Sequence, residues 1–409
     1  MSAPRTFAIV GANLAGGRAA ETLRARGFDG RIVLIGAEPE RPYERPPLSK
    51  ERLRGKKHDE ELFLRPQAYY ADQAIELRLG MPVERMNVRE HTLTLADGET
   101  LRYDRALVAS GSALRRLRVP GGELPGVHYL RTMREAASLA KALAKRPRVL
   151  VVGAGFIGCE VAASARILGC NVTMIDIATP LARALGEQMG AWVAGVHRAH
   201  GVTLHIGVGL QEFCGAAKLE AARLTDGREV ACDIAVVGVG VAPATDFLDG
   251  NAVMMENGIV VDEYCRTSAP DVYAAGDVAN WFHPTWGERL RVEHFDHAQN
   301  HGVAAAKSML DAGEAYAPVP FFWSDQYDLT LQYVGHAAHW DELVVRGSLE
   351  SGSFSAFYLD GGRLYACLAV NRFRDLSAAR RLLQERPAVD RTLLADESTD
   401  LKTLDASKA

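Results

Sequence analysis

Redox-active thiol pairs are missing from this sequence, and no cysteine at all precedes residue 159. The six cysteines that follow form neither a C-x-x-C motif nor a His-paired metal spacing, so they predict no dithiol centre and no zinc site. Isolated cysteines of this kind are typical of a cytoplasmic protein with reduced, mostly buried thiols. They stand at positions 159, 170, 214, 232, 265 and 367.

Long apolar runs are also lacking. The most apolar stretch, Val149–Ala165, contains Glu160 and has the pattern of a strand, a glycine-rich turn and a helix, so we expect no transmembrane span. The N-terminal FAIVGANLAGG is interrupted by glycine and asparagine, which favours a buried first strand over a signal peptide.

No charge of one sign dominates, because 47 Lys and Arg stand against 51 Asp and Glu. This balance calls for neither a nucleic acid nor a membrane as partner. His294, His297 and His301 share one helical face, but no cluster of carboxylates or thiols completes a metal site beside them. We therefore expect no bound metal.

Glycine is abundant, with 38 residues, and its placement is informative. Two segments share one pattern: an apolar strand, a glycine-rich turn, a helix, a second strand and an acidic residue. The first comprises Thr6–Val10, GANLAG, a helix to about Arg26, RIVLIG and Glu38. The second comprises Arg148–Val152, GAGFIG, a helix to about Leu168, NVTMI and Asp176. This pattern predicts two Rossmann-type modules, hence an α/β fold.

The second module carries a regular dinucleotide fingerprint. Gly153 permits the tight turn, Gly155 lets the backbone approach a pyrophosphate, and Gly158 lets the helix pack on the strand. Asp176 stands where an acid would bind a ribose 2′-hydroxyl and repel a 2′-phosphate, which favours NADH over NADPH. Alternatively, Asp176 is simply a solvated acid after a strand.

The first module is irregular, because Asn13 replaces the middle glycine between Gly11 and Gly16. Asparagine tolerates positive φ better than most residues, so the turn can survive, although we expect its side chain to crowd the pyrophosphate. Glu38 ends the next strand and is available for a ribose. Two such modules suit one bound flavin dinucleotide and one exchanging nicotinamide dinucleotide.

Each module is followed by a hairpin, with turns at Asp97-Gly98 and Asp226-Gly227. From about Phe321 the chain shows strands without phosphate loops and a helix over about 375–385, which predicts a separate α+β domain. We expect the polar residues from about 395 to 409 to fray.

Three further segments are more specific than the glycine fingerprints: RPYERPPLSK (41–50), TSAPDVYAAGD (267–277) and FFWSDQYD (321–328). With them, the chain is similar nearly end to end to the FAD-dependent ferredoxin reductases of oxygenase systems. The resemblance implies a glutathione-reductase-like fold with a discontinuous FAD domain (1–112 and 247–320), an NAD domain (113–246) and a C-terminal domain (321–409).

The resemblance also implies the binding residues. For FAD they are Gly11, Ala15, Gly16, Glu38, Arg45, Lys50, Val83, Gly111, Arg131, Asp277 and Phe295. For NADH they are Gly153, Gly155, Ile157, Gly158, Glu160, Asp176 and the loop Gly238, Val239 and Gly240. A plain strand-ending turn is the alternative for that last loop.

Lys50 and Glu160 are expected beside the reacting rings, with Trp323 covering part of the flavin. For Glu160 the residues argue independently, because a carboxylate among Phe156, Ile157 and Val161 is costly unless it is paired. The alternatives are an exposed helix position for Glu160, solvated surface for Lys50 and a plain core position for Trp323.

The implied reaction is hydride transfer from NADH to FAD, followed by electron transfer to a [2Fe–2S] ferredoxin, in a cytoplasmic monomer or homodimer. Relatives that reduce disulfides or peroxides carry a cysteine in the first flavin segment, which this chain lacks, and Cys159 is expected to be a packing residue. An NADH oxidase, a rubredoxin reductase or an apoptosis-inducing-factor-like signalling module remain alternatives. Candidate docking arginines, each otherwise a plain surface residue, are Arg65, Arg289, Arg291, Arg372 and Arg374.

Overall fold

The structure is a computed structural model that describes residues 4–248, 253–385 and 388–404. The described chain divides into two compact units. The first comprises the described residues of Met1–Glu44, Leu62–Ala113 and Ala242–Phe322, and the second those of Arg45–Glu61, Leu114–Val241 and Trp323–Ala409. Strands β8 (Ser112–Leu114) and β17 (Val241–Pro243) lie where the chain passes from one unit to the other.

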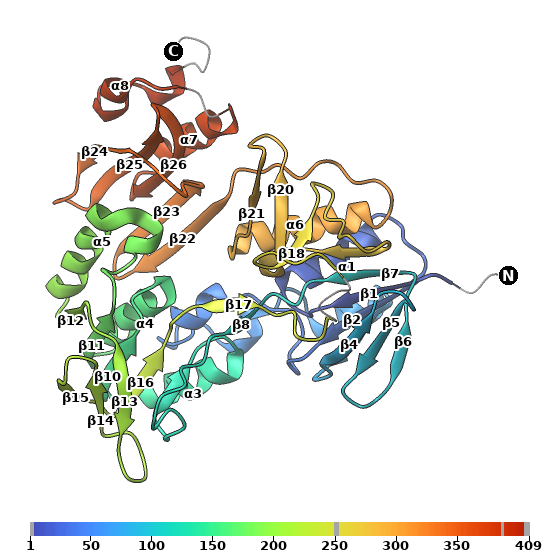
Figure 1. The fold of residues 1–409 in the computed structure, drawn as a ribbon, viewed down its shortest axis with the longest axis horizontal. Helices are drawn as coiled ribbons and strands as arrows, with labels where there is room; N and C mark the ends of the chain where they lie inside the picture. Colours follow the sequence, from blue (N-terminus) through green and yellow to red (C-terminus); the bar gives the residue numbers. More distant parts are fainter. Residues whose placement is uncertain (1–3, 249–252, 386–387, 405–409) are drawn as a thin grey trace. The chain divides into compact units, whose positions relative to one another are not determined.

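The first unit is built on a five-stranded parallel sheet in the order β19-β7-β1-β2-β3 (Figure 1). Its strands are β1 (Thr6–Val10), β2 (Arg31–Gly36), β3 (Ile75–Leu79), β7 (Arg105–Val108) and β19 (Val272–Ala274). The first two of these confirm the predicted strands Thr6–Val10 and RIVLIG. Helices α1 (Leu14–Ala25), α2 (Gln67–Asp72) and α6 (Phe295–Ser308) belong to the same unit.

Both faces of this sheet are covered, which explains its unbroken apolar strands. Phe7 and Ile9 of β1 pack in one buried cluster with residues of α1 and α6, whereas Ala8 and Val10 pack in another with Trp281. Two smaller sheets complete the unit: β4 (Val83–Asn87), β5 (Thr92–Leu95) and β6 (Thr100–Arg102), then β18 (Ile259–Val261), β20 (Ala279–His283) and β21 (Glu288–Leu290).

The second unit contains a five-stranded parallel sheet of its own, in the order β12-β11-β10-β16-β9. Its strands are β9 (Val127–Tyr129), β10 (Arg148–Val152), β11 (Asn171–Asp176), β12 (Thr203–Ile206) and β16 (Ile234–Val237). Its helices are α3 (Met133–Leu143), α4 (Phe156–Ile167) and α5 (Ala182–Ala199). A small sheet of β13 (Leu210–Cys214), β14 (Ala221–Leu224) and β15 (Glu229–Ala231) follows.

Both predicted hairpin turns are confirmed. Asp97-Gly98 joins β5 to β6 and Asp226-Gly227 joins β14 to β15, and each glycine has a φ of +85°. A positive φ strains residues with a side chain, so glycine is the natural residue at both points.

The second unit also contains a five-stranded sheet in the order β22-β23-β26-β25-β24, orange to red in Figure 1. Its strands are β22 (Phe321–Gln326), β23 (Leu329–Gly335), β24 (Glu342–Ser348), β25 (Ser353–Asp360) and β26 (Arg363–Val370), with helices α7 (Phe373–Glu385) and α8 (Arg391–Ala395). Several hydrogen bonds attach helix α5 to this part of the chain, and two of them involve the large aromatic side chains of Trp192 and Tyr358. Trp192 Nε1 donates to the carbonyl of Leu349, and the Tyr358 hydroxyl donates to that of Leu185, each at 2.9 Å.

The expectation that the tail frays from about residue 395 is wrong for the part that the structure describes. The guanidinium of Arg346 donates to the carbonyls of Leu394, Asp396, Glu397 and Thr399. Leu401, in a short 3-10 turn (Leu401–Thr403), is buried. A buried arginine thus orders a polar segment, which composition alone could not reveal.

The fold is therefore α/β, with two Rossmann-like parallel sheets and an added antiparallel sheet with helices. The predicted division into three domains, with bounds at 112, 246 and 320, differs from the two packing units and stays a prediction. Among the described residues, no helix combines the length and apolar character that a membrane span requires.

Candidate active site

The GAGFIG turn joins β10 to α4 and has no room for side chains at two of its glycines. Gly153 has a φ of +103°, and a Cβ added there would lie 2.3 Å from the carbonyl oxygen of Gly238. A Cβ on Gly158 would lie 2.0 Å from the carbonyl oxygen of Gly153. The first and third glycines of the fingerprint are therefore required by the protein's own backbone.

Gly155 is different, because nothing in the protein explains its small size. It is the N-cap of α4, no side chain caps that helix end, and a Cβ added there would meet no atom within 4 Å. Open space in front of uncapped backbone N–H groups fits the pyrophosphate of a dinucleotide. Ile157, two residues further along the chain, is 47% exposed and presents an apolar surface beside the same loop.

Asp176 ends β11 and organises the loops around it. Its Oδ2 accepts a hydrogen bond from the Ala154 amide at 2.6 Å, and its Oδ1 accepts one from the Ala178 amide at 3.0 Å. This half-buried carboxylate is therefore not a plain solvated acid. A carboxylate offers about four acceptor positions, so two remain for a ribose hydroxyl.

The first fingerprint, between β1 and α1, keeps the same backbone at its two glycines. A Cβ on Gly11 would lie 2.1 Å from the carbonyl oxygen of Ala109, and one on Gly16 would lie 1.9 Å from that of Gly11. Asn13 is held by contacts within the protein, and its predicted crowding of the pyrophosphate stays a prediction. Its amide nitrogen donates to the carbonyl of Ala109 and its oxygen accepts from the Gly16 amide, so the side chain caps α1 and folds back on its own loop.

The other predicted flavin contacts of the first unit occupy ordered positions. Glu38 accepts a hydrogen bond from the Tyr43 hydroxyl at 2.6 Å, and Asp277 accepts one from the Ser112 hydroxyl at 3.2 Å. Gly111 has a φ of +71°. The remaining three are Ala15, buried in α1, Val83, at the start of β4, and Phe295, at the start of α6.

Lys50 and Glu160 form a buried ion pair in the second unit. Both side chains are 5% exposed, and Lys50 Nζ lies 3.4 Å from Glu160 Oε1. Lys50 Nζ also lies 3.6 Å from Oδ2 of Asp325. The structure thus rejects the alternatives of an exposed helix position for Glu160 and of solvated surface for Lys50.

Two buried hydroxyls complete the surroundings of Glu160. Ser324 donates to its Oε1 at 2.7 Å, and Ser49 is hydrogen-bonded to its Oε2. Burial raises the pKa of Glu160 above its ordinary value, although Lys50 and the two serines oppose that shift. Sequence reasoning gave no role to Ser49, Ser324 or Asp325, although all three lie within PPLSK and WSDQ.

Three more predicted residues lie in this unit. Trp323 precedes Ser324 on β22, and Lys50 Nζ lies 5.7 Å from the centre of its ring, within the range of a cation–π contact. Arg45 donates to the main-chain carbonyl of Arg131 at 2.5 Å, so these two predicted flavin contacts are neighbours. The predicted flavin contacts therefore fall partly on each unit.

The Gly238–Gly240 loop follows β16 and faces the second fingerprint. The Gly238 amide donates to the carbonyl of Val152, and Gly240, with a φ of +98°, accepts from the Arg115 amide at 3.0 Å. Val239 is half-buried between them. The loop thus lies at the carboxyl end of β16, beside the second fingerprint, and its role in binding a nucleotide stays a prediction.

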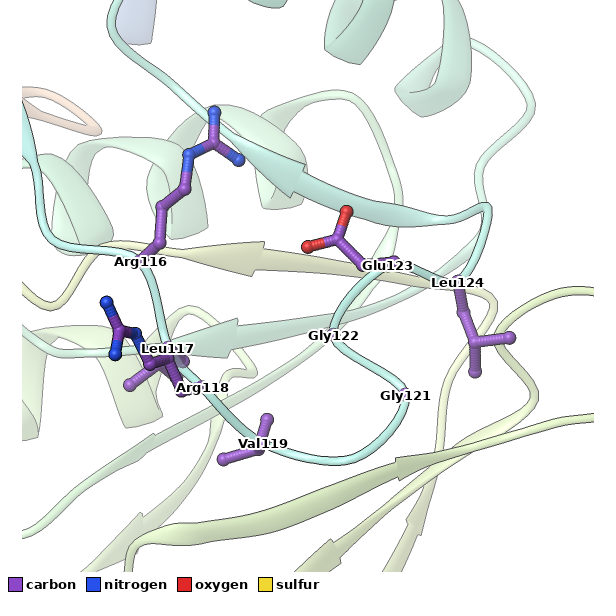
Figure 2. A pocket seen from close by; sticks show the side chains of 8 residues that line it. All are labelled: Arg116, Leu117, Arg118, Val119, Gly121, Gly122, Glu123 and Leu124. Carbon is purple, nitrogen blue, oxygen red and sulfur yellow. The ribbon is translucent and has the colours of Figure 1, made fainter.

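A hollow of about 600 Å³ lies on the loop between β8 and β9, and it contains none of the predicted site residues (Figure 2). Its lining consists of Arg116, Leu117, Arg118, Val119, Gly121, Gly122, Glu123 and Leu124. Arg116 is stacked on the ring of Tyr129. We assign this hollow no chemistry.

Cys159, beside Glu160, is fully buried and donates weakly to the carbonyl of Ala154. Burial raises the pKa of its thiol, so no reactive thiolate forms there near neutral pH. His297 and His301 are buried among Trp281 and Tyr316, and burial lowers the pKa of His301 to about 3. Across the described residues, no group of His, Cys, Asp and Glu is arranged to hold a metal ion.

Most of the candidate docking arginines have partners inside the protein. Arg65 is paired with Glu21, Arg291 with Glu293 and Arg372 with Asp375, Arg289 donates to the carbonyl of Val261, and Arg374 is exposed. Paired arginines still carry surface potential, but their positions are fixed by structural contacts.

Comparison with known proteins gives full-length matches. Residues 5–302 match the pyridine nucleotide-disulphide oxidoreductase family and residues 321–405 the reductase C-terminal family. The anthranilate 1,2-dioxygenase system ferredoxin–NAD(+) reductase component of Burkholderia cepacia is 42% identical over 97% of this chain and 98% of its own length.

Two solved structures share the fold closely. The ferredoxin reductase for the CYP199A2 system from Rhodopseudomonas palustris has a TM-score of 0.93 and 37% identity, covering 97% of this chain and 98% of that one. Putidaredoxin reductase in its covalent complex with putidaredoxin has a TM-score of 0.94 and 34% identity, covering 98% of each chain.

Proposed function

This chain belongs to the pyridine nucleotide-disulphide oxidoreductase family, among its ferredoxin–NAD(+) reductases, and we propose that it passes electrons from NADH through FAD to a [2Fe–2S] ferredoxin. That ferredoxin would donate electrons to a dioxygenase or a cytochrome P450. The observation that carries the proposal is the joint presence of two glycine turns shaped for pyrophosphate and a buried Lys50–Glu160 pair.

FAD, when bound, supplies the redox chemistry, since a flavin accepts two electrons as a hydride and releases them singly. The Gly11–Gly16 turn and Glu38 would hold its pyrophosphate and ribose, and Asp277 would lie near the ribityl chain. Lys50 and Glu160 would fix the charge beside the flavin ring. Further flavin contacts in this proposal are Ala15, Arg45, Val83, Gly111, Arg131, Phe295 and Trp323.

For NADH, α4 would bind the pyrophosphate at its N-terminus through the open space at Gly155, and Asp176 would accept from a ribose hydroxyl. Gly238, Val239 and Gly240 would give the nicotinamide half a backbone surface. Glu160 would orient the carboxamide end. In this arrangement two carboxylates flank Lys50 Nζ, that of Glu160 at 3.4 Å and that of Asp325 at 3.6 Å.

A disulfide or peroxide acceptor is disfavoured by the thiols. No cysteine precedes residue 159, and Cys159 is buried with its thiol protonated. Six free cysteines support a cytoplasmic location. We propose a monomer or a homodimer as the working unit.

Flavin content tests the proposal directly. The purified protein should show the visible absorption of oxidised flavin, NADH should bleach it under nitrogen, and an added [2Fe–2S] ferredoxin should restore it. A colourless protein that takes up no FAD would refute the proposal. Recovery with oxygen or rubredoxin but not with ferredoxin would reassign the acceptor to that of an NADH oxidase or a rubredoxin reductase.

Asp176→Ala should narrow the preference for NADH over NADPH by about tenfold, because the ribose loses an acceptor and a 2′-phosphate loses a repelling charge. The measurement is the ratio of kcat/KM for the two nucleotides. Asp226→Ala serves as the control. It removes another carboxylate that accepts a hydrogen bond from a nearby backbone amide, that of Arg228, and it should leave the ratio unchanged. An unaltered ratio in the Asp176 variant would remove its ribose role.

A further inference from the structure

Glu160 is the inner end of a buried chain of hydrogen bonds that reaches helix α5. Ser324 contacts Glu160 Oε1 at 2.7 Å, and Nε2 of Gln326 contacts the Ser324 hydroxyl at 3.2 Å. Oε1 of Gln326 lies 3.0 Å from Nε2 of His197, and Nδ1 of His197 lies 3.0 Å from the Tyr327 hydroxyl. Ser324, Gln326 and His197 are each at most 1% exposed.

The chemistry of these groups fixes the direction of every bond. The amide nitrogen of Gln326 can only donate, so the Ser324 oxygen accepts from it and keeps its own hydrogen for Glu160. The amide oxygen of Gln326 can only accept, so His197 carries its hydrogen on Nε2. Burial lowers the pKa of His197 to about 4, so the neutral ring accepts at Nδ1 from Tyr327.

We propose that Gln326 and His197 are positioning residues that act on Glu160 through Ser324, as a one-way chain of donors that favours its ionised carboxylate. Each group in the chain donates its hydrogen to the next group on the side of Glu160. A hydrogen bond to the charged form of an acid stabilises that form. If the hydroxyl of Ser324 turned away, Glu160 Oε1 would lose this donor and keep the contact with Lys50.

The outer end of the chain is held by aromatic contacts. The ring of Tyr327 is stacked on that of His200, with centroids 3.6 Å apart, and Tyr327 has a φ of +59°. A side-chain-bearing residue in the left-handed region is strained and needs support from its surroundings. Here the support includes His197 of α5 and His200 at the C-cap of that helix.

The charged and titratable groups around the chain are few. Lys50 and Cys159 lie beside Glu160, Asp325 lies beside Lys50, and Asp176 lies near Cys159. His200 lies near His197, and Arg166 and Cys159 lie near Tyr327. Burial raises the pKa values of Cys159 and Tyr327, so both stay neutral near pH 7. Burial disfavours the ionised form of Glu160, and Lys50 and the hydroxyl donors are the groups that oppose this effect.

This inference rests on the proposed function for its catalytic meaning. If Glu160 meets the nicotinamide end of NADH, its charge fixes how the nucleotide is oriented and at which pH the flavin is reduced. The chain would then let residues of α5 and β22, which need not touch either cofactor, set the pH range of hydride transfer.

The test is a titration of Glu160 itself in the oxidised holoenzyme without NADH, by NMR of protein labelled with ¹³C in the glutamate carboxyls. Glu160→Gln assigns the signal by its disappearance. In Gln326→Leu we expect the proton affinity of Glu160 to rise about tenfold, because its donor is no longer oriented. In stopped-flow experiments, the pH midpoint of flavin reduction should move upward with it.

A double mutant separates action through Ser324 from a general disturbance. Ser324→Ala should raise the proton affinity similarly, and adding Gln326→Leu to it should change nothing more, because the link is already broken. Gln332→Leu, the same change at a mostly buried position on β23, is the matched control and should titrate like the wild type.

An unchanged titration in Gln326→Leu would overturn the inference, as would additive effects of the two substitutions. Either result would leave the proposed function intact if NADH still bleaches the flavin. Conversely, a wild-type protein that NADH does not reduce would end the proposed function, while the NMR titration would still decide whether the chain acts on Glu160.

Discussion

Gly155→Val should give a folded protein that has lost most of its affinity for NADH. A Cβ at this position meets no protein atom within 4 Å, and the backbone there is extended with a φ of −74°, which valine adopts freely. Valine is a poorer N-cap than glycine, so stability should fall by no more than about 1 kcal/mol.

Binding should suffer far more, because the methyl groups would occupy the space proposed for the pyrophosphate. Losing about two charge-assisted hydrogen bonds, or about 3 kcal/mol, corresponds to about a hundredfold weaker binding. The dissociation constant for NADH can be measured by calorimetry with the oxidised holoenzyme.

Gly195→Val is the matched control, since that glycine of α5 also has nothing within 4 Å of an added Cβ. It should bind NADH like the wild type. Equal affinity of the Gly155 variant and the wild type would show that the open space at α4 is not the pyrophosphate site. The flavin should stay bound in both variants, because the Gly11–Gly16 turn belongs to the first unit.

Glu160→Ala should slow flavin reduction by NADH about a hundredfold, the order of effect expected when a reacting group is misplaced by about 1 Å. It should also lower the free energy of unfolding by about 3 kcal/mol, because Lys50 stays buried with only Asp325 as an acidic partner. Stopped-flow absorbance measures the first effect and denaturant unfolding of the holoenzyme the second.

Glu160→Gln separates these two effects. Glutamine keeps the size of the side chain and an acceptor for Ser324, but it removes the charge that Lys50 requires. We expect NADH to reduce the flavin of the Glu160→Gln variant slowly. The glutamine side chain should nevertheless pack more like that of the wild type than alanine does. A Glu160→Ala protein that NADH reduces at the wild-type rate would remove Glu160 from the active site.

Much of the fold could be predicted because it depends on local patterns. Apolar strands such as Thr6–Val10 and Arg148–Val152, followed by glycine turns, gave their bounds from composition and periodicity alone. The hairpin turns were equally local, since an Asp-Gly pair can adopt the tight backbone that joins two strands.

The site was harder to predict, because its contacts join residues far apart in the chain. Nothing around position 324 shows that Ser324 meets Glu160, and nothing around Gln326 points to His197. The contacts of Asn13 were hidden for a related reason. Nothing around position 13 shows that its side chain caps α1 and binds the distant carbonyl of Ala109.

The ordered tail suggests which changes this family can tolerate there. Arg346 binds main-chain oxygens, which every amino acid supplies, so substitutions at Asp396, Glu397 or Thr399 leave those bonds available. An insertion or deletion would instead shift the oxygens away from a fixed guanidinium. Over evolutionary time the length of this segment should thus be held more strictly than its sequence.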